Sequence, residues 1–224
     1  MVAGLTERGV AAVAPDLPGH GDDRAPLGAL RDDADRMAAI ANGIDGPVAL
    51  IGHSYGGAVV GQAVADCTNV AACVFLAGFL LRTGESIATA VHGSAAEPSA
   101  PLELLSVADD VAVVASRSAR DAFYADCAAP AADAAIEHLS PQRLSALTEP
   151  ATSDGWRHLP SGYVVCSDDR AFAPHSQGHL ALRADRFWVL PAGHSPFVSR
   201  PAKLADLLVE VVAELTAPMG SEIG

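Results

Sequence analysis

The segment Gly52–Gly57, GHSYGG, constrains the fold most strongly because it carries a G-x-S-x-G pattern. It directly follows the apolar run 47–51 (PVALI) and directly precedes a stretch from Ala58 that predicts a helix. A serine on a sharp strand-to-helix turn needs small neighbours, and the turn presents its hydroxyl above the carboxyl edge of a parallel sheet. The pattern predicts that Ser54 is a nucleophile and that the Tyr55 N–H, at the helix start, donates to an oxyanion. The alternative is a glycine-rich turn with an incidental serine.

Short apolar runs alternate with longer helix-like stretches along the chain, which is typical of an α/β protein with a parallel sheet covered by helices. The segment between residues 80 and 158 is instead rich in Ala, Ser, Pro and Asp, and it contains short helix-like stretches at 116–127 and 130–139. We expect core segments at 1–79 and 159–217, a helical cap at 80–158 and a tail at 218–224. The strands are expected at 10–14, 47–51, 70–76, 162–166 and 186–190, and the main helices at 27–44, 58–65 and 202–215.

The composition excludes several classes of binding partner. The chain has 27 Asp and Glu against 14 Lys and Arg, for a net charge of −13, so nucleic acid would be repelled. The four cysteines form no C-x-x-C pair, which suggests neither a metal site nor a disulfide framework. Because we find neither a signal peptide nor a membrane-spanning run, we expect a cytoplasmic protein whose partner is a small molecule rather than a membrane.

A serine nucleophile needs a base and a group that orients the base. His194 follows the expected strand 186–190, and Asp168 and Asp169 follow the expected strand at 162–166. Since the carboxyl ends of parallel strands meet at one edge, these side chains could gather there in the chain order Ser, Asp, His. The residues alone leave both aspartates open. A loop-stabilising histidine is the alternative for His194.

From PDLPGHG through GHSYGG, VVCSDD and AGHSPF to the closing helix, the chain resembles the α/β-hydrolases, and within them the small-capped methylesterase and hydroxynitrile-lyase group. The resemblance implies an α/β-hydrolase fold and, in VVCSDDRAFAP, makes Asp169 the catalytic acid and Asp168 a capping or solvent-facing residue. Cyanide-handling members carry a lysine close after the catalytic histidine, where this chain has Ser195 and Pro196. That difference favours ester hydrolysis, which needs no cofactor and no metal.

Members of this superfamily begin with a strand and a His-Gly loop that supplies a second oxyanion N–H. Here residues 1–9 look like the back half of the helix after that loop, and 10–14 like the next strand. Three explanations compete: a start downstream of the natural one, which we favour; a strand from a partner chain; or a strand at 10–14 that moves beside 47–51 while Gly19–Gly21 replaces the loop. An unpaired sheet position would also favour strand exchange or a homodimer.

The sequence therefore predicts a serine hydrolase that cleaves a small carboxylic ester through an acyl-enzyme, with Ser54, His194 and Asp169 as its triad. The alternatives are a catalytically impaired hydrolase-fold protein that binds a small hydrophobic ligand, because loss of one oxyanion donor costs about 10²–10³ in rate, and a C–C hydrolase or lyase with the same triad. Four apolar residues are expected to face the substrate, although each is also a normal core residue: Leu80, Phe123, Leu147 and Trp156.

Overall fold

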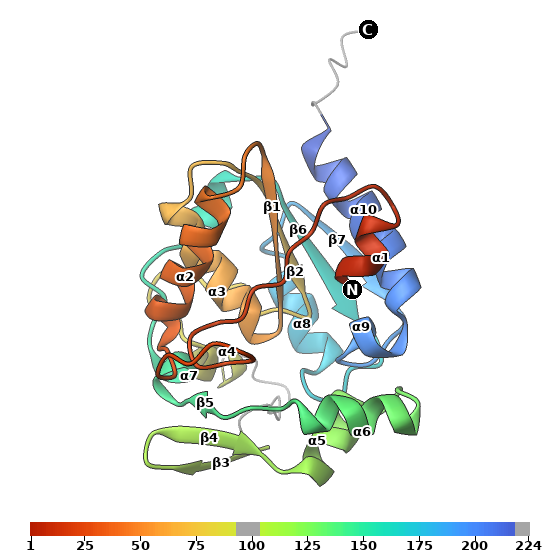
Figure 1. Ribbon diagram of the computed structural model, residues 1–224. Coiled ribbons are helices and arrows are strands. Elements are labelled where there is room, and N and C mark those ends of the chain that lie inside the picture. The colour runs from red at the N-terminus through yellow and green to blue at the C-terminus, as the bar shows by residue number, and fades with distance from the viewer. Residues whose placement is uncertain (93–103, 218–224) are drawn as a thin grey trace, which may run out of the picture.

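A parallel four-stranded sheet in the order β1-β2-β6-β7 forms the centre of the protein (Figure 1). The computed structural model describes residues 1–92 and 104–217, so the predicted tail 218–224 lies outside the described residues. Strands β2 and β7 coincide with the apolar runs that predicted them. Strand β1 starts one residue and ends two residues later than predicted, and β6 starts one residue earlier. The bounds are β1 Val48–His53, β2 Val70–Leu76, β6 Ser161–Cys166 and β7 Arg186–Leu190.

Successive side chains of a strand point to opposite faces, and the two faces of this sheet bury different helices. In β2, Cys73 and Phe75 pack in one apolar cluster with residues of α2, α3 and α8. Val74 and Leu76 pack in a second cluster with α1 and α10. Helices therefore cover both sides of the sheet (Figure 1), which confirms the α/β class. The bounds are α1 Val2–Thr6, α2 Leu30–Asn42, α3 Tyr55–Ala63, α8 Pro174–Ala181, α9 Pro196–Ser199 and α10 Pro201–Thr216.

The prediction of a strand at 10–14 is wrong. These residues follow α1 as an irregular segment on the surface, where Val13 is 65% exposed. A strand needs a neighbour for its backbone hydrogen bonds, and within the described residues β1 pairs with β2 alone. The suggestion that this segment moves beside β1 is wrong for the same reason. Residues 1–9 do contain the short helix α1, and Arg8 joins it to α10 through an ion pair with Asp206, 2.6 Å.

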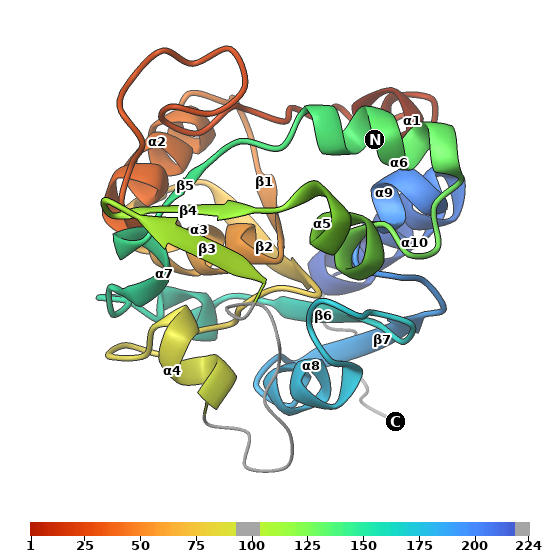
Figure 2. The same cartoon turned by 90° about the horizontal axis from the view of Figure 1, so that it is seen from below.

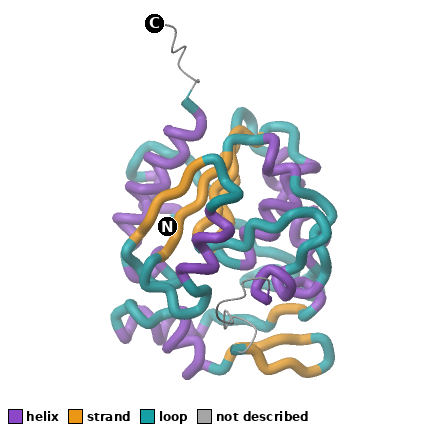
Figure 3. Tube along the Cα trace, turned by 180° about the vertical axis from the view of Figure 1, so that it is seen from behind, coloured by secondary structure: helices purple, strands orange, loops and turns teal. Residues whose placement is uncertain are grey.

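The described residues of the segment 80–158, which we call the cap, lie below the carboxyl ends of the main strands (Figures 1 and 2) and include a small antiparallel sheet besides helices. The sequence analysis missed this sheet, which stands apart from the main one (Figure 3), because its strands are too short to show a period. Asp109 and Asp110, both with positive φ, turn the chain from β3 to β4. The bounds are α4 Ile87–His92, β3 Leu105–Ala108, β4 Val111–Val114, α5 Ser116–Phe123, α6 Ala129–Glu137, β5 Gln142–Arg143 and α7 Ser145–Thr148.

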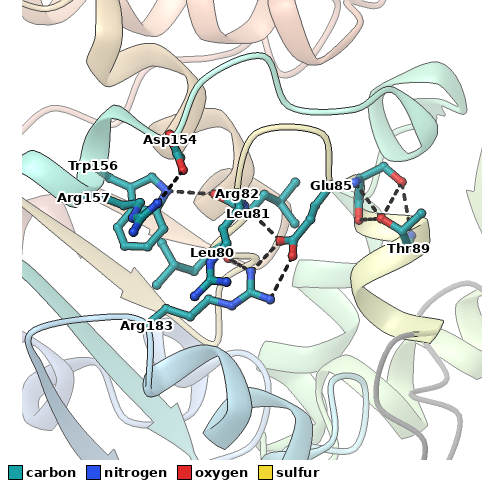
Figure 4. Close-up of polar contacts among 10 residues, drawn as sticks. Leu80, Leu81, Arg82, Glu85, Thr89, Asp154, Trp156, Arg157 and Arg183 are labelled. Atoms are coloured by element: carbon teal, nitrogen blue, oxygen red, sulfur yellow. Dashed lines mark hydrogen bonds and ion pairs between the residues drawn. The ribbon is translucent and has the colours of Figure 1, made fainter.

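Both ends of the cap meet at one place, which we call the cap base: residues 80–85, residues 151–157 and Arg183 (Figure 4). Arg183, just after α8, donates to the Leu80 carbonyl at 2.9 Å and to both carboxylate oxygens of Glu85 at 2.5 and 3.1 Å. The Trp156 indole donates to the Leu81 carbonyl at 2.8 Å. The cap is thus tied to the core helix layer where it leaves the sheet.

The helices were compared with the length and apolar character of a membrane span. None of those in residues 1–92 and 104–217 combines the length and the apolar character that a span requires.

Candidate active site

Ser54 lies between the end of β1 and the start of α3, with a φ of +50° that side-chain-bearing residues rarely adopt. Two neighbouring glycines make this turn possible. A Cβ on Gly52 would lie 2.3 Å from the Gly56 carbonyl oxygen, and a Cβ on Gly57 would lie 2.7 Å from the Phe79 nitrogen. The sharp turn predicted from the G-x-S-x-G pattern is therefore present. The backbone segments approach so closely at Gly52 and Gly57 that no side chain would fit at either position.

His194 joins Ser54 to Asp169. It follows β7 in the loop before α9, and its Nε2 lies 3.1 Å from Ser54 Oγ. Its Nδ1 lies 2.7 Å from Asp169 Oδ2. His194 and Asp169 are each 5% exposed. The structure thus brings together the three residues that the sequence analysis selected, in a geometry that allows a proton to pass from the serine to the imidazole.

The two aspartates after β6 have different surroundings. Asp168 is exposed, and its Oδ1 accepts a hydrogen bond from the adjacent Ser167 hydroxyl at 3.3 Å. Asp169 is buried, and its Oδ1 accepts the backbone N–H groups of Ala171 and Phe172 at 2.8 and 2.9 Å. These two bonds fix the orientation of the carboxylate and leave Oδ2 for the imidazole. Of the two residues, Asp169 is therefore the one placed to hold the imidazole.

Gln177 of α8, which the sequence analysis missed, also binds Asp169. Its amide nitrogen donates to Asp169 Oδ2 at 2.8 Å and to the Phe172 carbonyl at 2.6 Å. Its amide oxygen accepts the Cys166 N–H at 2.9 Å. The side chain is fully buried and so uses its donors and acceptor on one loop. The available signal was a glutamine on the same buried helix face as Leu180.

His53, beside the nucleophile, supports the His194 loop from the core side. Its Nε2 lies 2.7 Å from the His194 carbonyl oxygen, and the two rings are 4.7 Å apart. Burial, and secondarily the neighbouring His194, lowers the pKa of His53 to about 3. The ring is therefore neutral at pH 7, and it donates its Nε2–H to that carbonyl without adding a charge beside His194.

Tyr55 is the first residue of α3, so its backbone N–H has no acceptor within the helix and suits the predicted oxyanion role. The Tyr55 side chain has a separate partner, because its hydroxyl donates to the Asp33 carboxylate on α2. Burial raises the pKa of Asp33, and burial together with that carboxylate raises the pKa of Tyr55. The pair thereby fixes the side chain that follows the nucleophile.

The four apolar residues predicted to face the substrate lie in two environments. Phe123, at the end of α5, has its ring 5.3 Å from the His194 ring. Leu80, Leu147 and Trp156 are buried in the main core cluster, where Trp156 packs edge-on against Phe75 at 6.0 Å. Phe123 is therefore the cap residue of this set that the structure places at the catalytic candidates, and substrate contact by all four stays a prediction.

In the part of the chain that the structure describes, no three His, Cys, Asp or Glu side chains gather closely enough to hold a metal ion.

Comparison with known proteins gives a consistent picture. Residues 1–207 match the Alpha/beta hydrolase family. The protein named Probable hydrolase R7 from a Phoma species is 29% identical, over 94% of this chain and 90% of that protein. An alpha/beta hydrolase of Aspergillus novofumigatus is 26% identical, over 74% of this chain and 68% of that protein.

Solved structures share the fold at low identity. A pyrethroid hydrolase from Sphingobium faniae superposes with a TM-score of 0.79 at 24% identity, over 97% of this chain and 90% of the other. Polyneuridine aldehyde esterase gives 0.79 at 17%, over 92% and 90%. A methylesterase from Arabidopsis gives 0.76 at 20%, over 94% and 90%. These likenesses confirm the predicted fold.

Proposed function

The chain belongs to the alpha/beta hydrolase family, and from this premise we propose that it hydrolyses small carboxylic esters through an acyl-enzyme formed on Ser54. The observation that carries the proposal is the continuous hydrogen bonding from Ser54 Oγ through His194 to Asp169. Serine is a weak nucleophile until a base removes its proton, and a base of this kind needs an acceptor that fixes its tautomer.

The proposed reaction has two halves. Ser54 Oγ attacks the acyl carbon while His194 Nε2 takes the serine proton, and the tetrahedral oxyanion is held by the Tyr55 N–H. His194 then protonates the leaving alcohol, and the acyl group remains on Ser54. In the second half His194 activates a water molecule, which releases the acid and regenerates the serine. Asp169 stabilises the imidazolium in both halves.

Two features favour an ester as the substrate. Ser195 and Pro196 follow His194, where hydroxynitrile lyases of the resembling group carry a lysine, so the site has no cation there for cyanide. Phe123 places an apolar ring at the imidazole, which suits an apolar acyl or alcohol group. The names of the similar solved structures, an aldehyde esterase and a methylesterase among them, agree with this class.

The test is the reaction of the purified protein with a fluorophosphonate, read by intact mass, together with hydrolysis of p-nitrophenyl acetate. The wild type should gain one adduct and hydrolyse the ester. Ser54→Ala should gain none and lose about 10⁶-fold in kcat, to near background. Ester turnover retained by folded Ser54→Ala would overturn the nucleophile. A folded wild type without any adduct would instead favour the alternative, a hydrolase fold that binds a small hydrophobic ligand.

A further inference from the structure

The cap contacts the backbone next to the proposed base through Asp126, in the loop between α5 and α6. Asp126 Oδ2 accepts the N–H of Gly193, the residue before His194, at 2.9 Å. The approach is close, since a Cβ on Gly193 would lie 2.5 Å from Asp126 Oδ1. A carboxylate from the cap therefore binds the loop that carries the imidazole, at a point where a larger residue would push that carboxylate aside.

Other contacts of the cap join the same loop. The Phe123 ring lies against the His194 ring, and Val198 of α9 packs into the cap cluster formed by Ala119, Tyr124 and Ala132. Figure 2 shows α6 beside α9, in agreement with the contacts between these helices. On the other side of the loop, His53 donates to the His194 carbonyl. The loop is thus held between the core and the cap.

The imidazole must reach Ser54 and Asp169 at the same time, so small displacements of its backbone are costly; a misplacement of about 1 Å can reduce rate about 10²-fold. Without Asp126, the Gly193 N–H would lose its acceptor and the loop would lose its hydrogen bond to the cap. On the basis of the proposed function, we propose that Asp126 is a positioning residue, through which docking of the cap sets the geometry of His194.

The hydrogen bond needs an acceptor rather than a charge. The other polar neighbours of Asp126 are the Arg200 guanidinium, with Nε 3.9 Å from Oδ2, and the adjacent Cys127 thiol, 3.9 Å from Oδ1. These are long contacts, so the Gly193 N–H is the dominant partner. An asparagine can present its carbonyl oxygen to the same N–H and should therefore replace the aspartate.

The experiment compares Asp126→Ala and Asp126→Asn with the wild type, and uses Asp133→Ala as a matched control. Asp133 is an exposed aspartate of α6 that pairs with Arg120. Hydrolysis of p-nitrophenyl acetate gives kcat and KM, and proton NMR gives the far-downfield signal of the His194 Nδ1–H in its bond to Asp169. Thermal melting verifies that each variant is folded.

Asp126→Ala should lower kcat about 10–100-fold with little change in KM, and should broaden or shift the Nδ1–H signal. Asp126→Asn and Asp133→Ala should behave as the wild type in both readouts. An unchanged kcat and signal in folded Asp126→Ala would overturn the proposal, and so would equal losses in the alanine and asparagine variants.

Gly193→Ala disturbs the same contact from the other side and serves if Asp126→Ala does not fold. Its Cβ would lie 2.5 Å from Asp126 Oδ1, so the loss of kcat that Gly193→Ala causes should be smaller when residue 126 is already alanine. If the double variant with Asp126→Ala does not fold, Gly193→Ala alone must still move the Nδ1–H signal. Losses of kcat that multiply in the double variant, or an unmoved Nδ1–H signal, would contradict the contact between Gly193 and Asp126.

A wild type that lacks both ester turnover and a Ser54 adduct would refute the proposed function. The NMR signal would still test the positioning of His194 in that case.

Discussion

The two sides of the candidate active site are held in different ways. On the core side, Asp169 accepts hydrogen bonds from two backbone N–H groups, from Gln177 and from His194, and it is almost completely buried. On the cap side, the Phe123 ring contacts the His194 ring, and the Asp126 carboxylate accepts one hydrogen bond from the Gly193 N–H of the same loop. The core therefore holds the acid through four hydrogen bonds, whereas the cap contacts the loop of the base through one hydrogen bond and one ring contact.

The largest effect should come from the centre of the core side. Asp169→Asn keeps the size of the side chain but offers an amide to His194, which favours the wrong tautomer; kcat for p-nitrophenyl acetate should fall about 10⁴-fold. Asp168→Asn is the matched control, since this neighbouring carboxylate is exposed, and its kcat should stay near the wild type. Equal losses in the two variants would contradict the assignment of the triad acid to Asp169 rather than Asp168, and would remove the contrast between the two sides.

A smaller effect is expected one step away from the acid. Gln177→Leu removes the donor to Asp169 and leaves the buried Cys166 N–H and the Phe172 carbonyl without their side-chain partner. Each unsatisfied buried group costs about 1–3 kcal/mol, so the free energy of unfolding in urea should drop by at least about 2 kcal/mol. His175→Ala, an exposed change on the same helix, is the control. A Gln177→Leu protein as stable as the control would show that the core side is less tightly bonded than its contacts suggest.

The smallest effect on catalysis should arise at the cap base. Arg183→Leu breaks the paired bonds to Glu85 and should cost about 1–2 kcal/mol of unfolding free energy, discounted for partial exposure, with kcat little changed. Exposed Arg186→Ala, which breaks the ion pair with Glu214, should cost less than about 0.5 kcal/mol. A large loss of kcat in Arg183→Leu would mean that the cap base, too, positions the histidine.

The same pair predicts a dependence on pH. Burial opposes the charge of Glu85, but the Arg183 hydrogen bonds and the Arg82 N–H outweigh it and lower the pKa of Glu85 below its ordinary 4.5. A carboxyl whose pKa is lowered by folding stabilises the protein above about pH 4.5 and loses that contribution as the pH falls through the folded value. The difference in stability between wild type and Arg183→Leu should therefore narrow on acidification, as urea melts at several pH values would show.

The sequence predicted what depends on local pattern. Apolar runs located β2 and β7, and the glycines around Ser54 located the turn, because both signals arise within a few residues. The segment at 10–14 has the same apolar character as a buried strand, yet it forms none. Strand formation requires a partner, which a local run cannot reveal.

The contacts that surround the candidate triad were less accessible to sequence reasoning. Asp126 and Gln177 lie 68 and 17 residues from His194 in the chain, and only the packing of α5, α6 and α8 brings them to the loop or to its acid. Neither stands in a motif that announces a role. Their positions follow from tertiary structure, as do the short strands β3, β4 and β5, each too brief to show alternation.

The hydrogen bonding at the cap base has a consequence for changes in the length of the segment that it closes. The Gly84 N–H bonds to the Ala151 carbonyl at 2.8 Å, and the Ala151 N–H bonds to the Glu85 carbonyl at 2.7 Å. Hydrogen bonds therefore join the point where the chain leaves the core to the point where it returns. The entropic cost of closing a loop grows only slowly with the length of the loop. By this argument, a change in the length of the segment between Glu85 and Ala151 should cost little stability, and ester turnover should persist if Asp126 still accepts the Gly193 N–H.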